Sequence, residues 1–135
     1  MSVNDHAQNR QDASLSVDRA LPTADGNVTS ADIVIGTAGF PQAEGFSMGV
    51  RLPDLTSTHL PNADTLTVEL LNGASATPTT DIATRVVTGD GSTAAAQTVR
   101  LGVPRDAGSY FAIKMTAAGG TGDMSALTAV CGPLF

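Results

Sequence analysis

One stretch of the sequence carries the letters of a catalytic motif. Residues 45–49, GFSMG, match G-x-S-x-G, in which a nucleophilic serine occupies a sharp turn between a strand and a helix. Here the hydrophobic alternation runs straight through Ser47 to Leu52, and Pro53 follows. We therefore expect Ser47 to lie in mid-strand and to point outward. His59 is the only histidine downstream, and the chain is short for a hydrolase, so we predict no catalytic residues and no enzyme.

Metal chemistry finds equally little support. His6 and His59 are the only histidines, and neither has a second ligand at a metal-binding spacing. The aspartates of the predicted turns stand singly, where such residues usually bond their own backbone. They are Asp54, Asp64, Asp81, Asp90 and Asp123. We predict no metal and no cofactor, with a loop calcium site as the open alternative.

Two glycine-rich segments and one cysteine complete the candidates. Neither 89–91 nor 119–123 is followed by a lysine or a helix start, so we interpret both as turns and not as phosphate-binding loops. Cys131 lies in an apolar run without a basic neighbour. It is predicted to be a buried small hydrophobe and not a reactive thiol.

The segments that must position these residues are short, and within them apolar and polar residues alternate with period two. This pattern predicts strands and no helices. The expected strands are 32–35, 45–52, 65–71, 82–88, 97–103, 110–116 and 124–131. Turns are expected at Asn72-Gly73 and at 89–92, with a hairpin across the second one. Gly132-Pro133 is expected to end the last strand, and Lys114, the single lysine, is expected to point outward.

Seven or eight such strands predict an all-β fold, an antiparallel β-sandwich or jelly roll. Residues 1–14 have almost no apolar side chains and predict a flexible N-terminal arm, while 15–135 form a single domain. No apolar run reaches the length of a membrane span, and the N-terminus lacks a signal-peptide pattern, so we expect neither a membrane protein nor export by that route.

The composition points away from several partners. The 135 residues carry a net charge of −6, with only 15% charged and 4% aromatic residues. An acidic protein lacks the basic surface that nucleic acid requires, and scarce aromatics leave few stacking platforms. Threonine, serine and asparagine supply the polarity instead. This composition favours a scaffold that assembles with other proteins.

The arm, the segment TSADIVIG at 29–36, the Thr/Ala/Gly-rich connections and the terminal MSALTAV at 124–130 together resemble the capsid cement (decoration) proteins of tailed bacteriophages. The likeness is to the jelly-roll cement family typified by a Bordetella phage. It implies a jelly roll on the outer capsid surface of the virion, assembled in the host cytoplasm. It also implies a homotrimer that bridges major capsid protein subunits, with no catalysis.

Four residues are candidate partner contacts: Arg10, Asp12, Arg19 and Phe40. The first three carry most of the charge in and beside the arm, which we expect to order on a capsid subunit or on a neighbouring copy. The alternative function is a small glycan- or receptor-binding β-sandwich of a phage or surface protein. Only Tyr110 and Phe40 are available to stack on a sugar, which counts against it.

Overall fold

A computed structural model describes residues 15–35, 46–104 and 106–134 of the protein. Within these residues the backbone forms β-strands and no helix, as expected. The strands are β1 (Val17–Ala20), β2 (Asn27–Thr29), β3 (Ile33–Val34), β4 (Phe46–Leu52), β5 (Thr65–Gly73), β6 (Thr80–Thr88), β7 (Gln97–Val103), β8 (Tyr110–Ala118) and β9 (Thr128–Leu134).

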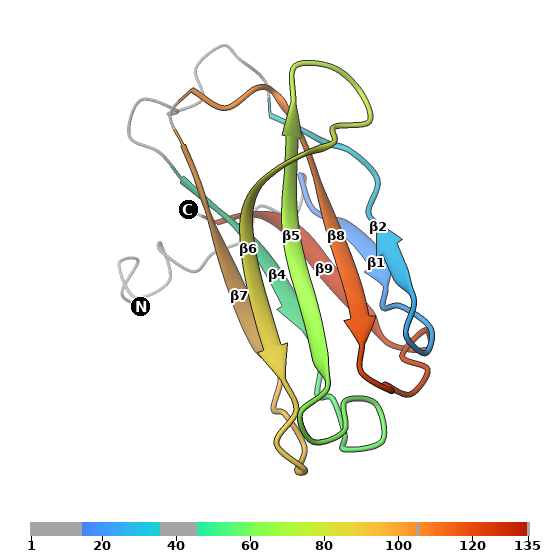
Figure 1. The fold of residues 1–135 in the computed structure, drawn as a ribbon. Helices are drawn as coiled ribbons and strands as arrows, with labels where there is room; N and C mark the ends of the chain where they lie inside the picture. Colours follow the sequence, from blue (N-terminus) through green and yellow to red (C-terminus); the bar gives the residue numbers. More distant parts are fainter. Residues whose placement is uncertain (1–14, 36–45, 105, 135) are drawn as a thin grey trace, which may run out of the picture.

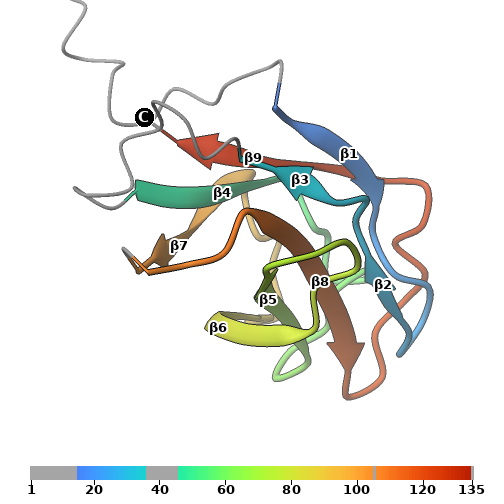
Figure 2. The same ribbon diagram turned by 90° about the horizontal axis from the view of Figure 1, so that it is seen from above.

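Two antiparallel sheets pack together as a sandwich (Figures 1 and 2). Sheet A has the order β1-β9-β4-β7, and sheet B has the order β2-β8-β5-β6, with β3 pairing with β8 beyond β2. The polypeptide passes between the sheets after β1, β3, β4, β6, β7 and β8. Such repeated passage between two antiparallel layers is typical of a jelly roll, so the predicted fold class is confirmed.

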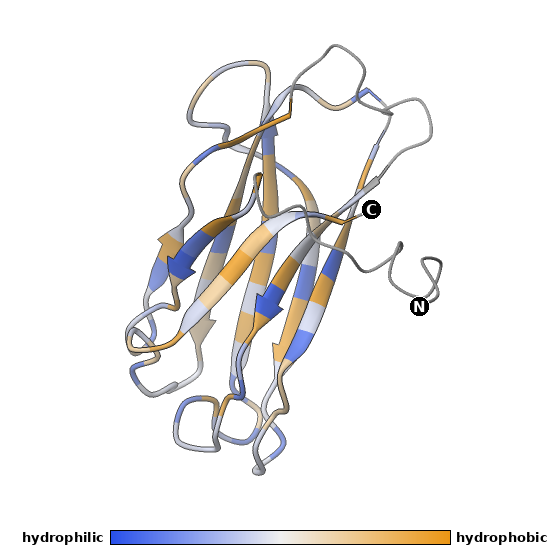
Figure 3. Cartoon of the chain, turned by 180° about the vertical axis from the view of Figure 1, so that it is seen from behind, coloured by the Kyte–Doolittle hydropathy of each residue, from blue (hydrophilic) through white to orange (hydrophobic). Residues whose placement is uncertain are grey.

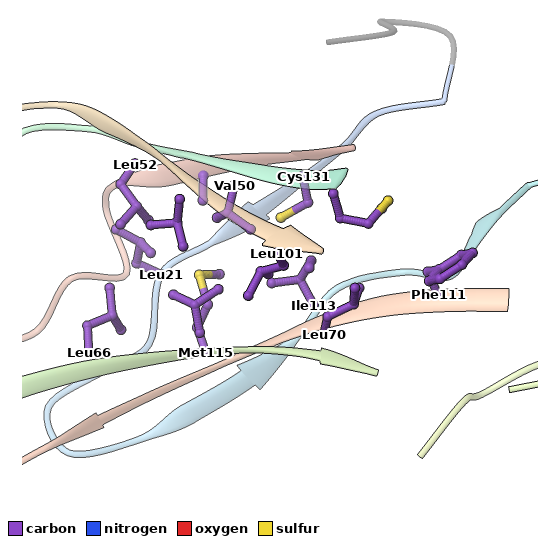
Figure 4. Close-up of a cluster of buried hydrophobic side chains, with 14 of the residues drawn as sticks. Leu21, Val50, Leu52, Leu66, Leu70, Leu101, Phe111, Ile113, Met115 and Cys131 are labelled. Carbon is purple, nitrogen blue, oxygen red and sulfur yellow. The ribbon is translucent and has the colours of Figure 1, made fainter. Parts of the chain in front are cut away.

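The core lies between the sheets and is built from alternate residues of the central strands. Figure 4 shows side chains of sheet A, such as Val50 and Leu52, directed at Leu66, Leu70 and Met115 of sheet B. Each is at most 3% exposed, and burying a side chain of this size stabilises the fold by roughly 1.5–3 kcal/mol. The alternating apolar and polar bands along the strands are visible in Figure 3.

Two strands extend through residues that predict turns. β5 continues through Asn72-Gly73, both paired with β8, so the expected turn there is wrong and the backbone turns at 74–77 instead. β9 begins only at Thr128 and runs through Gly132-Pro133. Pro133 fits because β1 pairs with β9 only as far as Cys131, which leaves no ladder partner on that side to need an N–H.

The predicted hairpin across 89–92 is also wrong. β6 pairs with β5 in sheet B, whereas β7 pairs with β4 in sheet A, so the glycine segment leads from one sheet to the other. Strand β3 is shorter than expected because only Ile33 and Val34 pair with β8. The β5–β6 loop folds back across β8, where Thr77 N–H donates to the Asp32 carboxylate at 2.9 Å.

Candidate interaction surface

Ser47 lies within β4, flanked in register by Gly102 of β7 and Leu134 of β9. It is therefore a mid-strand outward residue, as predicted, and no strand-to-helix turn is present at this point. The second glycine of the motif has a packing role instead. A methyl group at Gly49 would lie 2.7 Å from Cγ of Leu134. The Leu134 side chain lies over β4 at this point and is 3% exposed.

His59 belongs to the loop between β4 and β5, and His6 lies outside the described residues. The Nδ1 atom of His59 accepts a hydrogen bond from Thr56 N–H at 3.3 Å and lies 3.1 Å from the Thr56 hydroxyl oxygen. These bonds are local to one turn. Among the described residues, no group of three or more histidine, cysteine or carboxylate side chains is arranged to hold a metal ion.

Most of the loop aspartates bond backbone N–H groups. Asp90 accepts from Ser92 N and Oγ, and Asp123 accepts from Ser125 N. The serine side chains, followed by these backbone bonds, hold the pKa of both carboxyls below 3.8. Asp81 corrects the prediction of a turn, because it lies in β6 and accepts from Ala83 N and Thr84 Oγ1 beside a register shift.

The segment at 119–123 is a turn, with Gly119 and Gly120 at φ values of 104° and 114°. Its backbone resembles an anion-binding nest, but the protein fills it with its own carboxylate. Asp25 Oδ1 accepts from Gly120 N at 2.9 Å and from Thr121 N at 3.1 Å. The Asp25 backbone N–H in turn donates to Thr121 Oγ1. Sequence reasoning missed this contact between two loops, and only the Asp-Gly turn signal marked one side of it.

Cys131 is fully buried in β9, as predicted. Burial, with a smaller contribution from the Asp18 carboxylate, raises the pKa of its thiol from 9.0 to about 12. The thiolate that attacks electrophiles or binds metals is therefore scarce at neutral pH.

Of the four predicted partner contacts, the structure describes Arg19 alone, while Arg10, Asp12 and Phe40 lie outside the described residues. Arg19 is opposite the buried Ala129 in register and so belongs to the inward row of β1, at the edge of the sandwich. It is half-buried, and its buried Nε has no hydrogen-bond acceptor among the residues that the structure describes. This placement differs from that of a fully exposed surface charge, because the Arg19 side chain is partly buried at the edge of the sandwich.

The outer face of sheet B brings together threonines of four strands, which sequence reasoning did not combine into one surface. We call it the threonine face. It comprises Thr29, Thr65, Thr67, Thr84, Thr88 and Thr116, together with Val86, Glu69 and Lys114. Lys114 and Glu69 are register partners, so the two opposite charges face each other. Lys114 thus points outward as predicted, and Val86 is 54% exposed.

This face depends on strand register, which places threonines of four strands together. Thr116 of β8 lies between Asn27 of β2 and Thr67 of β5, and Thr67 lies opposite Val86 of β6. Each strand alone shows only an alternation of polar and apolar residues. The combined surface is nearly neutral and presents methyl and hydroxyl groups side by side.

No protein-family model, curated protein or solved structure matches the sequence or its fold. In the part of the chain that the structure describes, no helix is long and apolar enough to cross a membrane.

Proposed function

We propose that this protein is a capsid decoration protein that binds the outer surface of a phage head, bridges neighbouring major capsid subunits and stabilises the shell. The observation that carries the proposal is the threonine face on a jelly roll. The family resemblance of segments 29–36 and 124–130 supports the same role. The proposal includes self-association as a homotrimer and a place in the virion.

A face with few charges and mostly small side chains suits large protein contacts. Burying charges against a partner costs desolvation energy that their pairing does not always recover. On the threonine face, Glu69 and Lys114 are opposite each other, so these two charges offset each other. The exposed Asp81 carboxylate, which accepts from Thr84 Oγ1, adds one negative charge at the edge of the face. A subunit that touches several neighbours at once gains affinity through avidity, and each individual contact can stay weak.

The reactive groups among the described residues favour a binding role over catalysis. Ser47 lacks the strand-to-helix turn of a nucleophile, and the Cys131 thiol is buried with a raised pKa. The nest at Gly119 and Gly120 already holds the Asp25 carboxylate. We therefore propose a non-enzymatic protein without a cofactor.

Co-sedimentation with empty heads assembled from the major capsid protein of the same genome tests this proposal. We expect the protein to pellet with the heads and to raise their melting temperature. Val86→Lys, on the threonine face opposite Thr67, should reduce occupancy at least tenfold, since a desolvated charge costs more than about 1.4 kcal/mol. Ala20→Lys, on β1 opposite Thr128, is the matched control and should bind normally. Equal binding by both variants contradicts a role for this face.

The arm provides a second test. We propose that residues 1–14, outside the described part of the protein, bind a capsid subunit or a neighbouring copy. Their deletion should lower head occupancy while leaving the thermal unfolding of the free jelly roll unchanged. Undiminished occupancy after deletion rules out the arm as a contact.

A glycan-binding module is the second candidate. One observation favours it: Tyr110 lies opposite Val34, which is 47% exposed, on the outer side of sheet B. An aromatic ring beside an exposed apolar group is a common sugar platform. This candidate requires the isolated domain to bind host surface glycans and Tyr110→Ala to abolish that binding, while head binding is absent.

A further inference from the structure

The side chain of Asn72 is held by three hydrogen bonds at the end of β5. Its Nδ2 donates to the carbonyl oxygens of Gly108 and Tyr110, and its Oδ1 accepts from Gly108 N–H, each at 3.0 Å. Asn72 is only 8% exposed. Both donors of the amide are therefore used, and the side chain ties β5 to the segment that precedes β8.

The sequence Asn72-Gly73 is chemically labile when the backbone is flexible. The backbone nitrogen of Gly73 attacks Cγ of Asn72 and loses its proton, and the bond between Cγ and Nδ2 breaks to release ammonia. The cyclic imide that results takes up one water molecule and opens to an aspartyl or isoaspartyl residue. Glycine in the following position favours this reaction because it has no side chain to hinder the approach.

The fold keeps the reacting groups apart. Both residues are in extended strand conformation and pair with β8, Asn72 with Phe111 and Gly73 with Tyr110. The hydrogen bonds hold the Asn72 amide toward Gly108 and Tyr110. The Gly73 carbonyl is also enclosed, because a methyl group at Gly108 would lie 2.4 Å from its oxygen. Cyclisation therefore requires this end of the strand to open.

The product does not fit the site that the amide leaves. An aspartate at this position would turn a carboxylate oxygen toward the carbonyl oxygens of Gly108 and Tyr110, where the amide nitrogen now donates. A buried charge facing two acceptors is strongly unfavourable. We infer that Asn72 is a deamidation site that the native fold keeps closed, and that conversion in an opened protein prevents return to the native state.

This inference is independent of the proposed function, and peptide mapping of the full-length protein tests it. The protein is incubated at mildly alkaline pH, folded in buffer or unfolded in urea, and deamidation is followed at each asparagine. In urea Asn72 should convert before Asn27 and Asn62, which precede valine and alanine. In the folded protein conversion at Asn72 should be at least about 100-fold slower, because it needs a buried strand to open.

Asn62, exposed in the loop between β4 and β5, is the internal control and should be protected less by the fold than Asn72. Equal rates at Asn72 in folded and unfolded protein overturn the inference. Gly73→Ala should slow conversion in urea, where no fold is needed. After removal of urea from partly converted wild-type protein, the refolded fraction should match the fraction that keeps Asn72 intact. Normal refolding of converted molecules overturns the second half of the inference.

Discussion

The hydroxyl of Ser30 accepts a hydrogen bond from Ile113 N–H at 3.0 Å, at the point where the edge of sheet B is interrupted between β2 and β3. The Ser30 backbone N–H donates to the Ile113 carbonyl at 2.8 Å. Its hydroxyl also donates to the Ala31 carbonyl. One serine therefore satisfies both backbone groups of a fully buried β8 residue where neither short strand supplies a register partner.

Replacing Ser30 by alanine should lower the free energy of unfolding by about 1–3 kcal/mol, because it leaves the Ile113 N–H buried without an acceptor. Urea denaturation measures this loss. Thr29→Ala, at the adjacent exposed position, is the control and should change the free energy by less than about 0.5 kcal/mol. Equal effects of both substitutions contradict the structural role of the Ser30 hydroxyl.

Gly49 lies on β4 and Gly102 on the neighbouring β7, yet alanine should affect the two positions in opposite ways. At Gly49 the new methyl group collides with Leu134, so Gly49→Ala should destabilise the protein by about 1–3 kcal/mol. At Gly102 no atom of the described residues lies within 4 Å of the new group, so Gly102→Ala should be neutral or stabilising by up to about 1 kcal/mol. Thermal unfolding of both variants distinguishes them. A loss of stability in Gly102→Ala contradicts the space that the structure shows around Gly102.

Cys131 should make stability fall at alkaline pH. The pKa of the thiol is 9.0 in the unfolded chain and about 12 in the folded protein. Its contribution to the free energy of unfolding is therefore complete below pH 9 and is lost as pH rises toward 12. Across this window the wild type should lose about 1.4 kcal/mol per pH unit more than Cys131→Ala. If the free energies of unfolding of the two proteins change with pH in parallel, the expected effect of Cys131 is contradicted. In native buffer the thiol should react with Ellman's reagent only after urea is added.

The alternation of hydrophobic residues was sufficient to predict the positions of several strands. Residues 97–103 form β7 as expected, and 46–52 form β4 with Met48, Val50 and Leu52 buried. A strand with one buried face must alternate with period two whatever its partners are, so this information is local. The outward positions of Ser47 and Lys114 follow from the same pattern.

Which strands pair, and where the backbone turns at strand ends, depended on contacts between residues distant in sequence. Gly89 to Ser92 has the composition of a hairpin turn, but β6 pairs with β5 in sheet B while β7 pairs with β4 in sheet A. Asn72-Gly73 is a strong turn signal, yet the three bonds from Asn72 to Gly108 and Tyr110 keep it extended. Local preferences of this kind amount to about 1 kcal/mol, and a few buried hydrogen bonds exceed them.

The amino-acid sequence by itself thus determined an all-β protein with few charges, a buried cysteine and a mid-strand position for Ser47, because these properties reside in single residues and short periods. Only the tertiary structure decided that the strands form a jelly roll, that Asp25 fills the nest at Gly120, and that threonines from four strands form one face. Each of these arises from register between segments tens of residues apart, which a local pattern does not encode.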